Sequence, residues 1–397
     1  MSAAGGQSLA PSLHELAIAE RRNSLRRMGT GDGHGRGPTI EAIDVATYVV
    51  PTDAPESDGT LEWDRTTLVV VEIAAGGVRG LGYTYADAAA ALEVRETLAT
   101  LLRGGDVFAI PALNARMLER IRNLGRPGIV ATAMSAVDAA LWDTKARLLK
   151  LPLAALLGTA RASVPVYGSG GFTSYATGRL QEQLGGWAEQ GMKLVKMKVG
   201  RDAVADPARV NAARRAIGER AQLFVDANGG YSRTQALALA YLFAADDVRW
   251  FEEPVSSDDL DGLRSIRDRA PAGMDVAAGE YGYDPFYFRR MLDAGAVDVL
   301  QADATRCGGV SGFIAAHALC DARGLPLSAH CAPALHVHLG CALPRVRHIE
   351  YFHDHQRVER MLFDGATVPR DGLLSPDWDR PGLGLELKRA DAARFAV

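Results

Sequence analysis

Three short apolar segments that each end in a carboxylate constrain the fold of this chain more than any other feature. They read LFVD, RWFE and AAGE, and they end at Asp226, Glu252 and Glu280. The gaps of 26 and 28 residues fit one strand plus one crossover helix per step. Because the parallel strands of a barrel all end on one face, we expect the three carboxylates to converge there. Carboxylates this close repel one another, so the sequence predicts a hard divalent cation between them, and Mg²⁺ suits ligation by oxygen alone.

The composition is that of an ordinary globular protein. The chain has 397 residues, enough for two domains or one large barrel. Its hydrophobic content of 48%, charged content of 23% and net charge of −4 suggest neither a nucleic-acid partner nor a membrane partner. The longest mainly apolar run, Ala236–Ala245, is well short of the roughly 20 residues that span a bilayer. The four cysteines form no CxxC pair, so we expect no disulfide framework or zinc site, and a cytoplasmic location.

Residues 1–38 differ in composition from the rest of the chain. They are rich in Gly, Ser and Arg and lack the apolar core of a secretory signal. We therefore expect a flexible extension with one helical stretch near His14–Met28.

Residues 39–160 predict an α+β capping domain. Paired strands are expected at Ile40–Pro51 and Thr66–Ile73, with a long polar loop, Pro51–Asp64, between them. Helical patterns follow, and the clearest is Met134–Lys150, whose small residues on one face indicate close packing.

From Val164 onward, strand patterns alternate strictly with helix patterns. Seven crossovers between eight strands predict a closed (β/α)₇β barrel of the TIM type over residues 161–355. No helix pattern directly follows the eighth strand, and we expect the turn-rich segment 356–397 to return and complete the capping domain. The eight predicted strands are Val164–Ser169, Leu194–Val199, Leu223–Asp226, Val248–Phe251, Asp275–Ala278, Val297–Gln301, Leu327–His330 and His348–Tyr351.

Two lysines, Lys196 and Lys198, belong to the second predicted barrel strand. The alternation of side chains along a strand sends both to the same face, which near the mouth is the barrel interior. Two buried like charges are expected to lower the pKa of one lysine, and a neutral lysine can accept a proton. Two ordinary surface lysines beside Lys193 are the alternative interpretation of this motif taken alone.

Asp303 and His330 end the sixth and seventh predicted strands, one strand–helix unit apart. A hydrogen bond between neighbouring strand ends would fix the tautomer of His330 and support a charged imidazolium. A lone histidine in this position is more often structural, and we interpret the nearby His336 and His338 as helix residues only. Glu350 ends the eighth strand on the same rim.

Taken in order, the strand-end residues KxK, DAN, EEP, GE, D…GG, H and E resemble the enolase superfamily, and most of all its mandelate racemase group. The resemblance covers about residues 40–397 and includes the helix motif at Ala136–Gly158, which is similar to the capping-domain helix of that superfamily. It implies abstraction of the proton α to a carboxylate through an enediolate. It also implies one Mg²⁺ per subunit, held by Asp226, Glu252 and Glu280.

The resemblance also implies roles for the other strand-end residues. Lys198 would be the base on one face of a small-molecule carboxylate substrate, and His330, backed by Asp303, would act on the opposite face. The bound carboxylate and the charge that develops on it would be stabilised by Lys196, Asn228 and Glu350. Glu350 would have to be protonated in order to donate a hydrogen bond. Likeness to the family further suggests a homo-oligomer.

The sixth strand contains no lysine, and this absence narrows the class of reaction. Relatives similar to muconate cycloisomerases or dipeptide epimerases usually place a lysine there, whereas Val299–Thr305 contains none and the His330/Asp303 pair takes its place. This favours racemase- or dehydratase-type chemistry. The resemblance further implies dehydration of a sugar acid to a 2-keto-3-deoxy acid, an activity widespread among relatives of this type. The segments Pro51–Asp64 and Gly80–Asp87 are the expected specificity loops, and the role of Arg306 is open.

Three alternatives to dehydration stay open at this point. A racemase or epimerase of a 2-hydroxy acid would use the same residues to exchange a single α-proton. A Schiff-base aldolase would instead use Lys196 or Lys198 as a nucleophile. A barrel that binds Mg²⁺ and a carboxylate without turnover represents a different class of protein.

Overall fold

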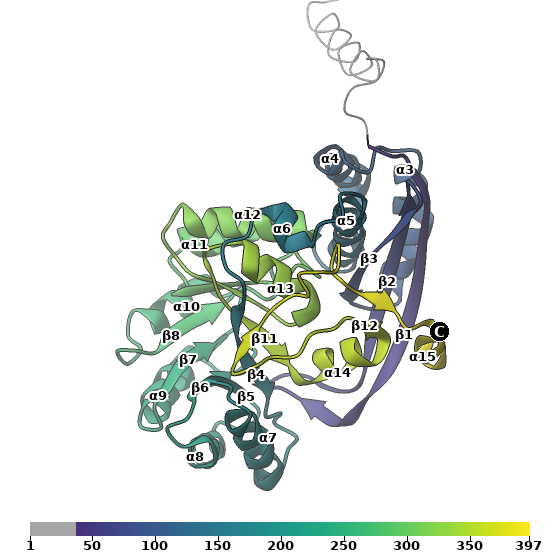
Figure 1. Ribbon diagram of the computed structural model, residues 1–397. Coiled ribbons are helices and arrows are strands. Elements are labelled where there is room, and N and C mark those ends of the chain that lie inside the picture. Colours follow the sequence, from purple (N-terminus) through teal and green to yellow (C-terminus); the bar gives the residue numbers. More distant parts are fainter. Residues whose placement is uncertain (1–36) are drawn as a thin grey trace, which may run out of the picture. The chain divides into compact units, whose positions relative to one another are not determined.

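Eight parallel strands close into a barrel at the centre of the molecule (Figure 1). The computed structural model describes residues 37–397, of which 38–397 form one compact unit. Each strand pairs with the next along the chain, and the last pairs with the first, so the predicted (β/α)₇β barrel is confirmed. The strands are β4 (Val164–Gly170), β5 (Leu194–Lys198), β6 (Gln222–Asp226), β7 (Val248–Glu252), β8 (Asp275–Ala278), β9 (Val299–Ala302), β10 (Leu327–Ala329) and β11 (Val346–Phe352).

Seven helices connect these strands and cover the outside of the barrel. Most have the amphipathic pattern expected of a surface helix, and several begin at a recognisable cap, such as the Ser232–Gln235 capping box at the start of α9. The helices are α7 (Thr177–Glu189), α8 (Asp206–Ile217), α9 (Arg233–Ala244), α10 (Leu260–Arg267), α11 (Pro285–Asp293), α12 (Gly309–Asp321) and α13 (Pro333–Ala342). None of the helices within residues 37–397 is both long and apolar enough to cross a membrane.

Aromatic side chains fill the barrel below its mouth. Phe224 and Trp250 stack with ring centroids 5.3 Å apart, and Tyr167 packs against both. Two residues farther along β6 and β7, on the same face, stand Asp226 and Glu252. The period-two alternation of the strands therefore places a layer of carboxylates directly above an apolar plug, which keeps water out from below.

The N-terminal domain is an antiparallel sheet, β1 (Ile40–Ser57), β2 (Glu62–Ala75) and β3 (Val78–Tyr85), covered by helices. The long helix α5 (Ile129–Leu148) packs so closely on β3 that a Cβ added at Gly82 would lie 2.2 Å from the carbonyl oxygen of Ala136. This contact explains the row of small residues on one face of the helix. The other helices are α2 (Ala89–Glu93), η1 (Val94–Leu98), α3 (Ala99–Leu102), α4 (Ile110–Arg120), η2 (Ile121–Asn123) and α6 (Leu153–Leu157).

Two segments predicted as loops are strands. Residues 51–64 form the far end of the β1–β2 hairpin, with a wide bulge between Pro51 and Glu56 that leaves the intervening residues of β1 unpaired. The prolines and aspartates that suggested a loop are tolerated because the bulge needs no ladder hydrogen bonds from them. Residues 80–85 belong to β3, and Tyr83 is buried there with its hydroxyl donating to Glu359.

A helix directly follows the eighth barrel strand, contrary to the prediction. It is α14 (His353–Leu362), and its pattern escaped notice because buried polar residues such as Asp354 and Glu359 occupy its inner face. The rest of the chain does return to the N-terminal sheet, where the backbone N–H of Val397 donates to the carbonyl of Thr47. The last elements are β12 (Phe363–Asp364), β13 (Leu373–Leu374), β14 (Glu386–Leu387), α15 (Arg389–Ala392) and η3 (Ala393–Phe395).

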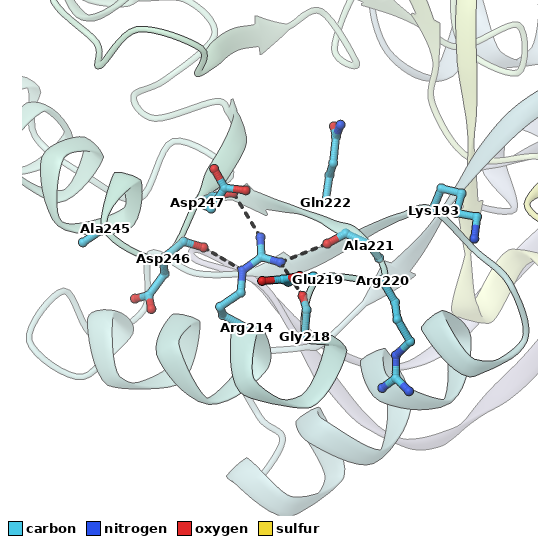
Figure 2. A pocket seen from close by; sticks show the side chains of 10 residues that line it. All are labelled: Lys193, Arg214, Gly218, Glu219, Arg220, Ala221, Gln222, Ala245, Asp246 and Asp247. Carbon is cyan, nitrogen blue, oxygen red and sulfur yellow. Dashed lines mark hydrogen bonds between the residues drawn. The ribbon is translucent and has the colours of Figure 1, made fainter.

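A hollow of about 700 Å³ opens where β6 and β7 begin, at the opposite end of these strands from the carboxylates (Figure 2). Arg214 spans it, and its guanidinium donates to the backbone carbonyls of Gly218, Ala221, Asp246 and Asp247. All of these partners are main-chain oxygens of the connections into β6 and β7, so the arginine fixes the two connections. We therefore interpret this hollow as structural. The predicted extension at residues 1–38, with its helical stretch at His14–Met28, lies almost wholly outside the residues that the structure describes.

Candidate active site

The three predicted carboxylates converge at the mouth of the barrel. Asp226 and Glu252 are the last residues of β6 and β7, and Glu280 follows β8 after a tight turn at Gly279. Gly279 has φ of +132°, and a Cβ there would lie 2.2 Å from the carbonyl oxygen of Gln301, so only glycine suits the turn that aims Glu280. One oxygen from each carboxylate lies within 4.8 Å of the others, and all three side chains are buried.

This cluster suits a divalent metal ion. Burial and the neighbouring charge of Asp226 raise the pKa of Glu252 well above its usual value. Within residues 37–397, Oε2 of Glu280 has no hydrogen-bond partner, although it is buried. Three oxygen ligands, one with an unused lone pair, match the preference of a hard cation such as Mg²⁺.

Lys196 and Lys198 approach the carboxylates from β5. The Nζ atom of Lys196 lies 2.6 Å from Oε1 of Glu252 and 2.8 Å from Oε1 of Glu350. The Nζ atom of Lys198 lies 2.5 Å from Oδ2 of Asp226. Both lysines are buried at the barrel mouth, so the alternative of two surface lysines is wrong.

The prediction of a lowered lysine pKa is also wrong for this arrangement. Burial does lower the pKa of each lysine, but the charge of Glu252 on Lys196 and the charge of Asp226 on Lys198 outweigh it. The pKa of both groups is therefore raised above its usual value. Two like charges side by side would lower the pKa of a lysine, but here the carboxylates of the neighbouring strands have the larger effect.

Asp303 and His330 form the predicted hydrogen-bonded pair, with 2.8 Å between Oδ2 of Asp303 and Nδ1 of His330. Asp303 also accepts hydrogen bonds from the backbone and the hydroxyl of Thr305, each 2.7 Å long. Burial alone would raise the pKa of Asp303, but the hydrogen bond with His330 and the nearby positive charges lower it overall. An ionised Asp303 fixes the ring of His330 and leaves Nε2 facing the carboxylates, 3.3 Å from Oε2 of Glu280.

Glu350 and Asn228 border the same cluster. Glu350 accepts hydrogen bonds from the hydroxyl of Ser169 and the backbone N–H of Cys331, at 2.6 and 3.1 Å. Although burial raises its pKa, the charge of Lys196 lowers it well below the usual value, which favours the ionised form over the expected protonated donor. The side-chain amide oxygen, Oδ1, of Asn228 accepts a hydrogen bond from Nζ of Lys198 at 3.1 Å.

Other residues at the site were overlooked or left open. Cys331, one of the four cysteines, is buried with Sγ 3.2 Å from Nε2 of His330. Arg306, whose role was open, donates to the backbone carbonyl of Glu280 at 3.1 Å and lies 3.6 Å from Asp303. Ser169 was missed altogether, and its position at the mouth end of the first barrel strand is the signal that could have found it. By contrast, His336 and His338 bond to backbone groups within and around α13, as predicted.

The structure thus brings all nine predicted residues to one end of the barrel. An amine from β5 contacts the first carboxylate of the cluster, and an imidazole from the end of β10 faces the third. The two groups flank the cluster from strands that are far apart in the barrel order. Such a site can hold a cation and a carboxylate ligand between a potential base and a potential acid.

Comparison with known proteins agrees with this geometry. Residues 40–158 match the mandelate racemase/muconate lactonizing enzyme N-terminal domain, and residues 179–392 match the enolase C-terminal domain-like family. The chain is 32% identical to 3,6-anhydro-alpha-L-galactonate cycloisomerase of Streptomyces coelicolor, over 90% of this chain and 99% of that protein. It is 30% identical to L-talarate/galactarate dehydratase of Salmonella typhimurium, over 96% of this chain and 95% of that protein.

Solved structures show the same architecture. A mandelate racemase/muconate lactonizing enzyme-like protein from Rubrobacter xylanophilus is 56% identical and superposes with a TM-score of 0.89, over 91% of this chain and 100% of that one. L-talarate dehydratase from a Polaromonas species, complexed with Mg and L-glucarate, is 30% identical with a TM-score of 0.83, over 91% of this chain and 98% of that one. On its sequence, its fold and the residues at its barrel mouth, the chain belongs to the mandelate racemase/muconate lactonizing enzyme family of the enolase superfamily.

Proposed function

We propose that the protein is a Mg²⁺-dependent dehydratase that converts a sugar acid to a 2-keto-3-deoxy acid. The observation that carries the proposal is a cluster of three buried carboxylates, with Lys198 against Asp226 and the His330–Asp303 pair against Glu280. The similarity to acid-sugar dehydratases and cycloisomerases supports the class of substrate.

The carboxylates Asp226, Glu252 and Glu280 would hold the cation. Mg²⁺ bound there would act as a Lewis acid on the substrate carboxylate and make its α-proton more acidic. Lys196, buried among these anions, would add a fixed positive charge next to the same carboxylate. The apolar plug below and the buried walls keep the site dry, which strengthens each of these interactions.

Lys198 and His330 would carry out the proton transfers. Against the effect of burial, the charge of Asp226 raises the pKa of Lys198, and a cation held by Asp226 would offset that charge. Lys198 could then lose its proton and take the α-proton from one face of the substrate. His330 would give its Nε2 proton to the β-hydroxyl, which then leaves as water, while Asp303 at Nδ1 holds the ring in place. The C–O bond at the β-carbon breaks as the α,β double bond forms, and the resulting enol becomes the 2-keto acid. Asn228, beside Lys198, and Arg306, beside Glu280, would contact polar atoms of the substrate.

A cycloisomerase is the second candidate, and the 32% identical Streptomyces coelicolor relative favours it. The same base would start the reaction, but the leaving oxygen would stay attached to the product as part of an opened ring. The product of a cycloisomerase therefore has the mass of its substrate, whereas a dehydratase product is lighter by one water. An epimerase would give no keto acid, and its product would differ in mass from the substrate only by the α-deuterium taken up in D₂O.

The test is a screen of acid sugars, their lactones and their 3,6-anhydro forms with Mg²⁺ in D₂O. Mass spectrometry and a keto-acid assay separate the three reactions. On the substrate that turns over, Lys198→Ala and His330→Ala are each expected to reduce kcat by at least about 100-fold while circular dichroism remains that of the folded protein. Full activity in either variant would contradict the proposed roles. No reaction of any acid sugar with the wild-type protein would leave the non-catalytic alternative as the better description.

A further inference from the structure

A second cluster of metal-binding groups lies outside the site described above. Asp53 and Glu56 come from the bulge of β1, and His353 is the first residue of α14. One ligand atom from each of the three residues lies within 4.8 Å of the others. Oδ2 of Asp53 and Nε2 of His353 are 3.1 Å apart, close to the roughly 3.4 Å that separates two ligands of a tetrahedral zinc ion.

Glu56 is the unusual member of this cluster. Its side chain has an exposed fraction of 0%, and Oε2 accepts a hydrogen bond from the indole of Trp63 at 2.9 Å. Its other oxygen, Oε1, has no hydrogen-bond partner within residues 37–397. A buried carboxylate oxygen without a partner, on a side chain within reach of two other ligand groups, is costly unless a cation or another donor satisfies it.

The charges around Glu56 are mostly negative. Burial, together with the nearby charges of Asp354 and Asp53, raises its pKa to about 8. The nearest cation, Arg357, pairs with Asp354 at 2.6 Å and donates to the carbonyl of Pro51, so it is already used. Arg179 pairs with Asp53 at 3.3 Å and donates to the hydroxyl of Tyr175 at 3.1 Å. A divalent ion would supply the positive charge that these side chains do not provide.

The cluster joins the capping domain to the rim of the barrel. The bulge is held against the barrel by the hydrogen bond from Arg357 to Pro51 and by one from the hydroxyl of Ser174 to the carbonyl of Pro55. His353 follows directly after β11, the strand that carries Glu350 of the candidate active site. Figure 1 shows the long strand β1 running past α14. An ion in this position would connect two segments that are 297 residues apart in the sequence.

We propose that Asp53, Glu56 and His353 form a second divalent-metal site that fastens the β1 bulge to the barrel. One imidazole nitrogen with two carboxylate oxygens suits a borderline ion such as Zn²⁺, with water as the fourth ligand. This ligand set differs from the all-oxygen set at Asp226, Glu252 and Glu280, so Mg²⁺ and Zn²⁺ should prefer different sites. Asp53 is exposed at the surface, which gives the ion a path of entry.

The test measures Zn²⁺ binding by tag-free, full-length protein in millimolar Mg²⁺, which keeps the all-oxygen site filled. Equilibrium dialysis with metal analysis should give one Zn²⁺ per wild-type chain, and Zn²⁺ should raise the Tm. His353→Gln and Asp53→Asn should each weaken Zn²⁺ binding by at least about tenfold and abolish the Tm increase. Both residues are partly exposed, so these variants should fold. The matched control is His317→Gln in α12, which removes a histidine from another part of the surface and should leave Zn²⁺ binding unchanged.

Co²⁺ distinguishes this site from the other group that could bind a soft ion, His330, Cys331 and Glu350. At the proposed site, Co²⁺ should give visible d–d bands without a thiolate charge-transfer band, and Cys331→Ser should leave the spectrum unchanged. A thiolate band that disappears in Cys331→Ser, or Zn²⁺ affinity that is equal in the wild type and in His353→Gln, would overturn the proposal. So would a wild-type protein that binds no second ion. None of these measurements requires a known substrate. They can therefore disprove the second metal site without bearing on the proposed dehydratase activity.

Discussion

In the proposed reaction, the buried carboxylate of Asp303 would act through His330 without touching the substrate. It contacts Nδ1 of His330, the nitrogen that faces away from the cluster, so it sets the tautomer and supports the charged form of the ring. Thr305 in turn holds Asp303 with two hydrogen bonds. Asp303 is therefore a positioning residue, and its replacement should affect the chemical step more than the binding of substrate.

We predict that Asp303→Asn lowers kcat by at least about 100-fold while KM changes less than about threefold. The amide keeps the size of the side chain but removes the charge that balances an imidazolium at His330. Steady-state kinetics on the acid sugar found by screening would check this. Asp298→Asn is the matched control, because Asp298 lies at the other end of the same strand, paired with Arg267 at 2.7 Å, and should leave kcat within about twofold. Equal losses in the two variants would mean that the effect is structural.

At the residue scale, the sequence predicted positions better than protonation states. The alternation of side chains and the repeated strand–helix spacing were sufficient to bring Lys196, Asp226 and Glu350 to one place. The charge states depend on which groups of different strands face one another, and a linear pattern does not contain that information. For this reason the pKa of Lys198 and the ionisation of Glu350 were both misjudged.

At the scale of elements, α5 and β3 depend on an unusually close contact. A Cβ at Gly82 would lie 2.2 Å from the carbonyl oxygen of Ala136 and 2.4 Å from the backbone nitrogen of Ala140. Backbone atoms of a packed helix cannot move away as the end of a side chain can. The sequence indicated a closely packed helix, but it did not identify the strand that packs against it.

We predict that Gly82→Ala lowers the free energy of unfolding by about 3 kcal/mol, because α5 must shift away from the sheet. Urea denaturation would measure the change. Gly178→Ala in α7 is the control: nothing lies within 4 Å of the added Cβ, and a helical alanine should change stability by less than about 1 kcal/mol, toward greater stability. A Gly82→Ala variant as stable as the wild type would show that the two elements can separate at little cost.

Helix α13 should make stability depend on pH through a neutral histidine. His338 is buried, its Nδ1 accepts from the backbone N–H of Ala154, and its Nε2 donates to the carbonyl of Leu383. Burial lowers its pKa from 6.5 to about 4. The unfolded chain therefore takes up a proton at a higher pH than the folded protein does, so this contribution to stability is present above about pH 6.5 and is lost as the pH falls toward 4.

Between pH 7 and pH 5, the contribution of His338 to the free energy of unfolding falls by about 2 kcal/mol. We predict that His338→Gln, whose amide can make both hydrogen bonds without titrating, loses about 2 kcal/mol less stability than the wild type over that range. Urea denaturation at the two pH values would measure this. Parallel losses in the two proteins would show that His338 is protonated without cost in the folded state.

The boundaries of the barrel strands could be predicted because each strand is a short apolar run between turn signals, and β4 to β11 lie within about two residues of the expected positions. Two elements could not be predicted for opposite reasons. The far end of β1 contains prolines and aspartates that its bulge tolerates, so a strand was mistaken for a loop. The inner face of α14 is mixed: Asp354, His355 and Glu359 are buried there beside Val358 and Leu362, so polar residues interrupt the apolar stripe that would reveal a helix.

At the scale of the whole molecule, buried polar contacts join the N-terminal sheet to the barrel. Tyr83 of β3 donates to Glu359 of α14 at 2.6 Å, and the hydroxyl of Thr84 donates to the carbonyl of Thr305, next to the loop that carries Asp303. The N-terminal sheet therefore holds α14 and the loop after β9 through direct hydrogen bonds. These contacts connect distant parts of the sequence, and only the three-dimensional structure reveals them.

Asp143 of α5 makes a further buried link. Replacing it tests whether the N-terminal sheet and the barrel unfold together. Its carboxylate is buried and accepts from the backbone N–H of Leu81 at 2.6 Å, from the backbone N–H of Leu383 at 2.5 Å and from Nε of Arg147 at 2.7 Å. It thus binds the sheet and the C-terminal segment to the same helix. Asparagine in its place would turn an amide group toward one of these N–H donors and leave Arg147 without its charge partner.

We predict that Asp143→Asn lowers the free energy of unfolding by about 3 to 5 kcal/mol in a single cooperative transition. Tryptophan fluorescence and far-UV circular dichroism should follow the same curve in urea, because loss of this link loosens the sheet and the C-terminal segment at once. Asp44→Asn, which removes an exposed partner of Arg79, should change stability by no more than about 0.5 kcal/mol. If the two probes instead separate into two transitions in Asp143→Asn, this carboxylate is what makes the capping domain and the barrel cooperative. If the variant keeps the wild-type midpoint, the other contacts suffice and the role assigned to Asp143 is wrong.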